Sequence, residues 1–185
     1  MNKILVEISV GELLDKISIL KIKKEKIKDP EKLKFIEDEY KILQTQLDNN
    51  IKSDKKLDEL FESLKKINSK LWVIEDEKRL CEKNSDFGEK FIKFSRDIHF
   101  LNDDRSKIKL EINTYTGSKI KEINSKLWVI EDEKRLCEKN SDFGENFVQL
   151  SRNVHLLNDK RANIKLEINN ITGSKIKEVK EYTNY

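Results

Sequence analysis

The stretch from Leu57 to Leu101 decides the fold, and it reads LDELFESLKKINSKLWVIEDEKRLCEKNSDFGEKFIKFSRDIHFL. Residues spaced alternately three and four apart form an apolar stripe on each side of Asn84–Gly88, which predicts helices packed along a common seam. The seam residues are Leu57, Leu60, Leu64, Ile67, Leu71, Ile74, Lys78 and Cys81, then Phe87, Phe91, Phe94, Ile98, Leu101, Arg105, Ile108, Ile112 and Tyr115. We therefore predict two antiparallel helices joined by a tight turn, with Asp86 capping the second helix and Glu89 at its third position.

This hairpin occurs twice in the chain. The segment 67–122 recurs as 123–178, with 44 of 56 positions identical. Apolar positions that differ stay apolar, as in Ile92 and Val148 or Phe94 and Leu150. We therefore expect both copies to pack, and we interpret the chain as a tandem duplication within a 129-residue ancestor. Two units are too few for a solenoid.

The N-terminal part also predicts helices. Ser9 and Glu12 form a capping box for a helix over 10–27, and Asp29-Pro30 begins another over 30–49. Ser53 or Asp54 can cap the helix that follows. We predict an all-α fold, a four-helix bundle ancestor with antiparallel, coiled-coil-like hairpins. We divide it into 1–122, an ancestral bundle with the first hairpin copy at 67–122, and 123–185, with the second copy at 123–178 and a tail.

The second hairpin is expected to be incomplete. The duplicated unit begins inside the helix that starts near residue 54, so the helix from about 119 lacks counterparts of Leu57 and Leu60. Its partner helix, over about 143–171, should extend beyond it. That overhang would need another helix, from this chain or from a second chain.

The charge balance excludes several classes of partner. The 38 Lys and Arg against 35 Asp and Glu leave a net charge of only +3, with the two signs interleaved along the chain, so we expect no nucleic-acid partner. A lysine cluster over 21–28 fits the negative end of a helix dipole and does not require a membrane surface. The N-terminus has no secretory or membrane-spanning run, and Cys81 and Cys137 form no disulfide framework. We expect a cytoplasmic protein.

One face of the hairpin combines tryptophan, carboxylates and arginines. Trp72 follows the seam residue Leu71 and would face water in an isolated hairpin, so it predicts contact with a third helix or a platform for a ligand. Reflection across the turn places Glu75 opposite Arg96, and the second copy repeats this pairing. The candidate binding residues are Trp72, Glu75, Asp76, Arg79, Arg96, Trp128, Glu131, Asp132, Arg135 and Arg152. Two interpretations stay open: ion pairs that set the register within each hairpin, or an arginine pocket for an anionic metabolite.

Other motifs add little chemistry. Lys78 and Arg105 interrupt the seam, and we expect their charged ends to reach water while their stems pack. His99 and His155 lack a Glu-x-x-His arrangement, and no phosphate loop, nucleophile elbow or CxxC motif occurs, so we predict no metal, no cofactor and no catalytic residues. This pattern favours a non-enzymatic interaction or scaffold protein, with a protein partner or self-association, over a small all-helical enzyme or anionic-metabolite binder.

Three stretches resemble a known family. ISVGELLDKISIL at 8–20, LWVIED at 71–76 and NDKRA at 158–162 are similar to motifs of short bacterial proteins known only as a domain of unknown function. The resemblance covers essentially the whole 129-residue ancestor. It implies a small intracellular helical protein and brings no established activity or site.

Overall fold

In the computed structural model, which describes residues 7–118 and 125–171, every regular element is an α-helix. The helices are α1 (Val10–Lys26), α2 (Pro30–Asn50), α3 (Lys55–Lys83), α4 (Glu89–Thr116), α5 (Ser125–Lys139) and α6 (Glu145–Ile171). This confirms the predicted all-α class. The predicted start of α5 near 119 lies outside the described residues.

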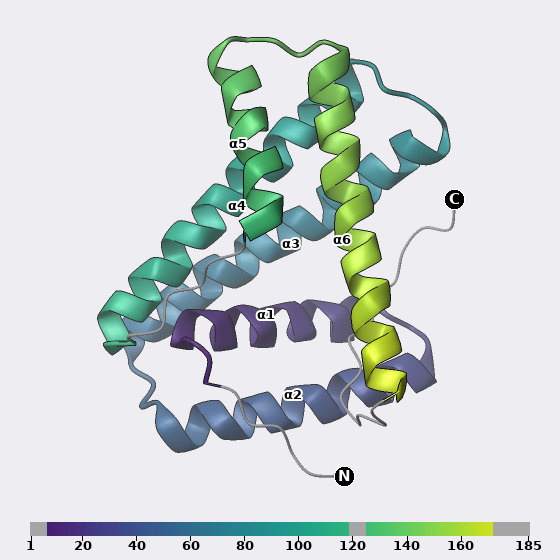
Figure 1. Cartoon of the computed structure of the whole chain (residues 1–185). Helices are drawn as coiled ribbons and strands as arrows, with labels where there is room; N and C mark the ends of the chain where they lie inside the picture. Colours follow the sequence, from purple (N-terminus) through teal and green to yellow (C-terminus); the bar gives the residue numbers. More distant parts are fainter. Residues whose placement is uncertain (1–6, 119–124, 172–185) are drawn as a thin grey trace.

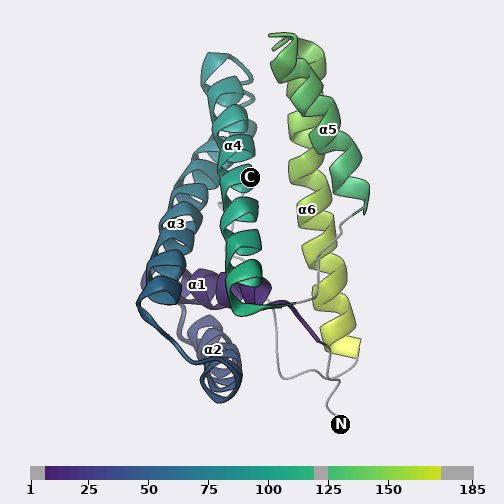
Figure 2. The ribbon, with the colours of Figure 1, turned by 90° about the vertical axis from the view of Figure 1, so that its left-hand side faces the viewer.

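The helices form two hairpins and a platform. Figures 1 and 2 show α3–α4 and α5–α6 side by side, with their turns at the same end of the molecule. The contact between the hairpins is made mainly by α4 and α6. Helix α1 crosses the half of α3–α4 that lies away from the turn, and α2 packs against the other side of α1. The chain therefore has a base at one end and paired hairpin arms at the other.

The core of this base comes from α1 to α4. Leu14, Leu57, Leu64 and Ile112 form one buried cluster. A second cluster joins α1 to α2 through Leu20, Ile27 and Ile36. Farther along the α3–α4 seam Leu71, Phe91 and Ile98 are buried as the spacing predicts. None of these residues belongs to α5 or α6.

The two turns have the same geometry, and they differ from the predicted capping. Ser85 adopts a left-handed conformation at φ 54°, and the Asp86 amide donates to the Cys81 carbonyl at 2.9 Å, which closes α3 with a Schellman motif. This motif extends past the end of α3, so the chain reverses later than expected. Gly88, not Asp86, is the N-cap of α4, and Asp86 instead accepts a hydrogen bond from the Gly88 amide at 3.2 Å.

Because of this turn, the second helix of each hairpin begins later than predicted. Glu89 is the first residue of α4 and not its third. Ser141 repeats the left-handed conformation at φ 53°, and α6 begins at Glu145, two residues later than predicted. Because the 23 residues from 67 to 89, which contain the whole turn, are identical to 123–145, the same local sequence specifies this geometry twice.

At the N-terminal caps the predictions hold in part. The Glu12 amide donates to Ser9 Oγ at 3.2 Å, and Asp54, not Ser53, caps α3. The Glu12 carboxylate does not complete the capping box. It pairs instead with Lys109 of α4, 2.6 Å away. In the described residues α5 spans 15 residues and α6 spans 27, so α6 extends beyond its partner as predicted.

The crossing of α1 over α4 depends on a glycine. The Gly11 amide donates to Asn113 Oδ1 at 2.7 Å, so the two backbones lie close together. A Cβ added at Gly11 would lie 2.5 Å from the Lys109 carbonyl oxygen and 2.9 Å from Asn113 Oδ1. The carbonyl belongs to the α4 backbone and cannot move away alone.

We expect Gly11→Ala to lower the free energy of unfolding by about 1–2 kcal/mol, measured by urea denaturation. Overpacking costs roughly 1–3 kcal/mol, which outweighs the gain of about 1 kcal/mol in helix propensity. Ser63→Ala is the control, because it also places an alanine inside a helix but at an exposed position of α3, and its stability should change little. Equal stability of Gly11→Ala and the unchanged protein would contradict the close crossing.

Candidate functional site

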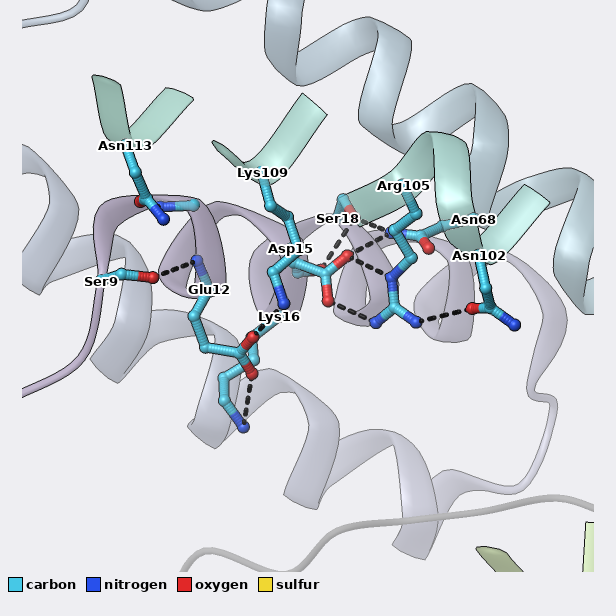
Figure 3. Close-up of polar contacts among 11 residues, drawn as sticks. Ser9, Glu12, Asp15, Lys16, Ser18, Asn68, Asn102, Arg105, Lys109 and Asn113 are labelled. Atoms are coloured by element: carbon cyan, nitrogen blue, oxygen red, sulfur yellow. Dashed lines mark hydrogen bonds and ion pairs between the residues drawn. The ribbon is translucent and has the colours of Figure 1, made fainter. Parts of the chain in front are cut away.

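Two clusters of polar side chains lie between helices, and the first joins α1 to the long hairpin. We call it the α1 junction (Figure 3). Asp15 of α1 is 1% exposed and accepts hydrogen bonds from Arg105 Nε of α4 and Asn68 Nδ2 of α3, both at 2.8 Å. Arg105 Nη2 bonds the other carboxylate oxygen, so the ion pair is bidentate. Asn68 also donates to Ser18 Oγ at 2.7 Å.

Electrostatics keep this pair ionised. Burial by itself would raise the pKa of Asp15, but the hydrogen bond and the charge of Arg105 outweigh it, and the pKa lies below its ordinary value. Burial also disfavours the charged form of Arg105, but the hydrogen bonds and the negative charge of Asp15 outweigh burial, so the pKa of Arg105 is raised. The charged end of Arg105 therefore binds a buried carboxylate, and the prediction that it extends to water is wrong. These groups satisfy one another, so the junction positions α1 and leaves little to bind a ligand.

The second cluster, which we call the hairpin interface, lies between α3–α4 and α5–α6. Arg96 Nε of α4 donates to Glu138 Oε1 of α5 at 2.6 Å. Arg152 Nη2 of α6 donates to Glu82 Oε1 of α3 at 2.8 Å. The prediction that Arg96 lies opposite Glu75 within its own hairpin is therefore wrong, because its carboxylate partner belongs to the other copy.

The contacts of the two arginines are equivalent. Each guanidinium also covers the phenylalanine near the end of the opposing hairpin's turn: Arg96 lies 4.3 Å from the centroid of Phe143, and Arg152 lies 4.5 Å from that of Phe87. The hydrogen bond to Glu138 raises the pKa of Arg96. Arg96 thus packs its planar face on an aromatic ring while its edge binds a carboxylate, a geometry that Lys would not reproduce.

A further pair of contacts repeats this exchange farther from the turns. Arg135 Nη2 of α5 bonds Asp103 of α4 at 2.8 Å. Arg79 of α3 lies 3.7 Å from Asp159 of α6. Arg79 and Arg135 are equivalent in the repeat, and so are Asp103 and Asp159.

Lysines and serines fill the centre of the hairpin interface. Lys78 Nζ donates to the backbone carbonyl of Ser151 at 2.9 Å, and Lys78 is 5% exposed. Its equivalent, Lys134, is 1% exposed. The prediction that Lys78 extends its ammonium group to water is therefore wrong. Ser95 of α4 and Ser151 of α6 are fully buried, and their small side chains allow the two helices to lie close together. Among the described residues, neither hydroxyl has a hydrogen-bond partner.

The remaining predicted site residues do not converge on one pocket. Trp72 is half-buried on α3, and Glu75 acts electrostatically on Arg105 at the α1 junction. Burial raises the pKa of Asp76, despite the charge of Arg79 and a hydrogen bond from Trp72. Asp132 bonds Arg135 within α5, at 2.7 Å. The side chains of Trp128 and Glu131 lie outside the described residues.

The acidic half of the hairpin interface was not predicted from the sequence. Glu82, Glu138, Asp103 and Asp159 were not among the predicted residues, because reflection across a turn compares helices of one hairpin only. Asp15 was missed as well. The sequence did contain a signal for this pair. Asp15 is the single carboxylate within the apolar run of α1, and Arg105 is the single arginine in the α4 seam. Each interrupts a stripe that would otherwise be apolar, so the two could have been expected to pair.

Reactive groups are scarce in the part of the chain that the structure describes. No three His, Cys, Asp or Glu side chains come together there in an arrangement that could hold a metal ion. Burial raises the pKa of the Cys81 and Cys137 thiols, which disfavours the nucleophilic thiolate. No helix in residues 7–118 or 125–171 has the length and apolar content to cross a membrane.

Comparison with known proteins identifies a family. A family of unknown function (DUF6165) matches residues 4–122, about two thirds of the chain, and the protein belongs to it. The matched segment ends at the last residue of the first repeat copy. No curated protein and no solved structure gave a match.

The Asp15–Arg105 pair predicts a pH dependence. Because the folded-state pKa of Asp15 is lowered, its contribution is fully present above the unfolded value of about 4 and is lost as the pH falls through the folded value. We expect Asp15→Asn to cost about 3 kcal/mol at pH 7. Urea denaturation should show this difference shrinking between pH 5 and pH 2. The exposed Asp104→Asn is the control, and an equal cost of Asp15→Asn at every pH would exclude an ionised pair.

The two unpartnered serine hydroxyls predict a gain in stability. Replacing Ser95 and Ser151 together by alanine removes two buried polar groups and keeps the small side chains that α4 and α6 need at their contact. We expect the double variant to be more stable by about 1–2 kcal/mol in urea denaturation. Ser63→Ala, on the exposed face of α3, should have a near-zero effect. A less stable double variant would show that the hydroxyls are hydrogen-bonded in solution.

Proposed function

We propose that this member of the DUF6165 family acts non-enzymatically, as an interaction or scaffold protein that binds partners by packing its helical hairpins. One observation carries the proposal. The arginines of the face that could have held an anionic metabolite are bound to carboxylates of the opposing hairpin, as Arg96 is to Glu138 and Arg152 to Glu82. The face thus recognises a protein surface.

An anionic metabolite would have to compete with these carboxylates. Glu82 and Glu138 each have side chains only 13% exposed, so an incoming anion would displace a partly desolvated acceptor from a guanidinium that is also stacked on phenylalanine. Such charge-assisted contacts are stronger than neutral hydrogen bonds. Arg105, whose carboxylate partner Asp15 is 1% exposed, belongs to the separate α1 junction. A single arginine pocket therefore has little support.

The geometry of α6 is consistent with helix packing as the mode of binding. Its C-terminal half extends beyond α5 in the described residues, whereas the corresponding half of α4 packs against α1 and α3. An amphipathic helix without its usual neighbours is a recurrent docking element. The unpaired cysteines Cys81 and Cys137 are consistent with the reducing environment of the cytoplasm, where we place the protein.

The proposal is tested by a double-mutant cycle in the intact chain. We expect Arg152→Glu and Glu82→Arg each to destabilise the protein, because each places like charges together at the hairpin interface, and the double variant to recover most of the loss. The coupling free energy from urea denaturation should be about 1 kcal/mol or more. The matched cycle at Lys107 and Asp104, an exposed pair on α4, should give a few tenths of a kcal/mol at most.

The same variants separate binding of protein surfaces from binding of anions. Inorganic pyrophosphate is titrated at constant ionic strength while the melting temperature is followed. We expect no saturable rise. A saturable rise that Arg152→Glu abolishes would overturn the proposal in favour of a metabolite site, and so would the absence of coupling between Arg152 and Glu82.

A further inference from the structure

The contacts at the hairpin interface come in reciprocal pairs. Arg96 of the first hairpin binds Glu138 of the second. Their equivalents in the repeat, 56 positions away, are Arg152 and Glu82, and these two residues also bind each other. The same exchange relates the stacking of Arg96 on Phe143 to that of Arg152 on Phe87. We propose that the hairpin interface is a homodimer interface contained within one chain, and that a single-hairpin form of this protein pairs with a second copy of itself through the same residues.

Reciprocity is the defining property of a two-fold interface. When residue i of one unit contacts residue j of the other, and j contacts i in return, one patch serves both sides. A third pair obeys this rule, because Arg79 faces Asp159 while Arg135 binds Asp103. Two unrelated faces brought together by a linker would have no reason to match in this way.

The face is self-complementary in charge. Each repeat carries both the arginine and the carboxylate of every pair, so a copy of the unit supplies what the other lacks. All residues in these pairs are identical in the two copies. In a dimer of single-hairpin units, Arg96 of each unit would bind Glu82 of the other, and Arg79 would face Asp103.

The centre of the face also requires a partner. Lys78 is 5% exposed and donates to the Ser151 carbonyl of the second hairpin. Without that hairpin its ammonium loses this acceptor and the adjacent apolar surface is uncovered. Ser95 is the equivalent of Ser151, so a second copy offers the matching carbonyl. Ile92, which packs against the core of the second hairpin, would also become exposed to solvent without a second copy.

The single-hairpin unit contains its own core. The buried clusters of α1 to α4 draw on residues between Leu14 and Ile112, with no member from α5 or α6. Removing residues 123–178 joins 1–122 to 179–185 and leaves both clusters whole. In the intact chain the second hairpin is tethered, so its high effective concentration should keep it on this surface and exclude a second chain.

The inference rests on the proposed function and is tested by removing one repeat. The variant lacking 123–178 and the intact chain are compared by size-exclusion chromatography with light scattering, at about 100 μM because small interfaces often bind in the micromolar range. Circular dichroism first establishes that the variant is helical. We expect the deletion variant to have twice its sequence mass and the intact chain to be a monomer.

Charge reversal then identifies the surface used. In the deletion variant, Arg96→Glu and Glu82→Arg should each give a monomer, because both reciprocal contacts become repulsive. Mixing these two variants should restore the dimer as a 1:1 heterodimer, since each contact then joins opposite charges. Lys107→Glu, on the exposed face of α4, should leave the dimer unchanged. Mixed variants that stay monomeric would overturn the inference.

Two further outcomes are decisive. A helical deletion variant that is monomeric, together with normal Arg152–Glu82 coupling in the intact chain, would overturn the homodimer and leave the proposed function standing. If the deletion variant does not fold, removal of 67–122 offers an equivalent chain, because Ile67 and Ile123 begin identical stretches. Failure of both chains to fold would show that the hairpins are not separable units, and would overturn the inference as well.

Discussion

Burial of the apolar seam between α3 and α4 is the constraint on which the remaining structure depends. Leu64 and Phe91, at 0% exposure, lie along this seam, and the Schellman turn at Ser85 holds the two helices in register. Once the hairpin exists, its two ends present different surfaces. The end away from the turn accepts α1, and the end near the turn accepts a second hairpin. Both attachments use charged groups at positions where the seam is interrupted.

Those interruptions give each end its own specificity. Arg105 breaks the seam where α1 crosses, and its bidentate pair with Asp15 fixes the position of α1. Lys78 breaks the seam near the turn, and its ammonium binds a carbonyl of α6. A buried charge is costly without a partner, so each such residue disfavours arrangements in which its particular acceptor is absent. The apolar stripe supplies most of the driving force for packing, and the charged residues within it determine which helix packs against the stripe.

The repeated hairpin sequence gives this chain a geometry that a single hairpin lacks. The family match covers the N-terminal region through one hairpin, and the second hairpin repeats the first nearly residue for residue. The repeat begins inside α3, so the second copy contains the turn and the near-turn surface but no counterpart of the start of α3. The near-turn surfaces of the two hairpins contact each other. Among the described residues, the far half of α6 does not have the α1 contact that α4 makes. Joined in one chain, the hairpins pair without the entropic cost of bringing two molecules together.

The sequence by itself determined the helices that the structure describes, the positions of the two turns, the capping by Ser9, and most of the seam, because helix periodicity and capping act between residues a few positions apart. It left the cap of α3 open between Ser53 and Asp54, and it placed the cap of α4 at Asp86 where the structure has Gly88. It could not determine that Arg96 binds Glu138 and not Glu75. In a chain with 39% charged residues, many acid–base pairings are chemically equivalent, and one-dimensional spacing does not distinguish them. Only the placement of one hairpin beside the other decides which charges meet. That placement follows from the shapes and buried centres of whole surfaces, which assemble from residues far apart in sequence.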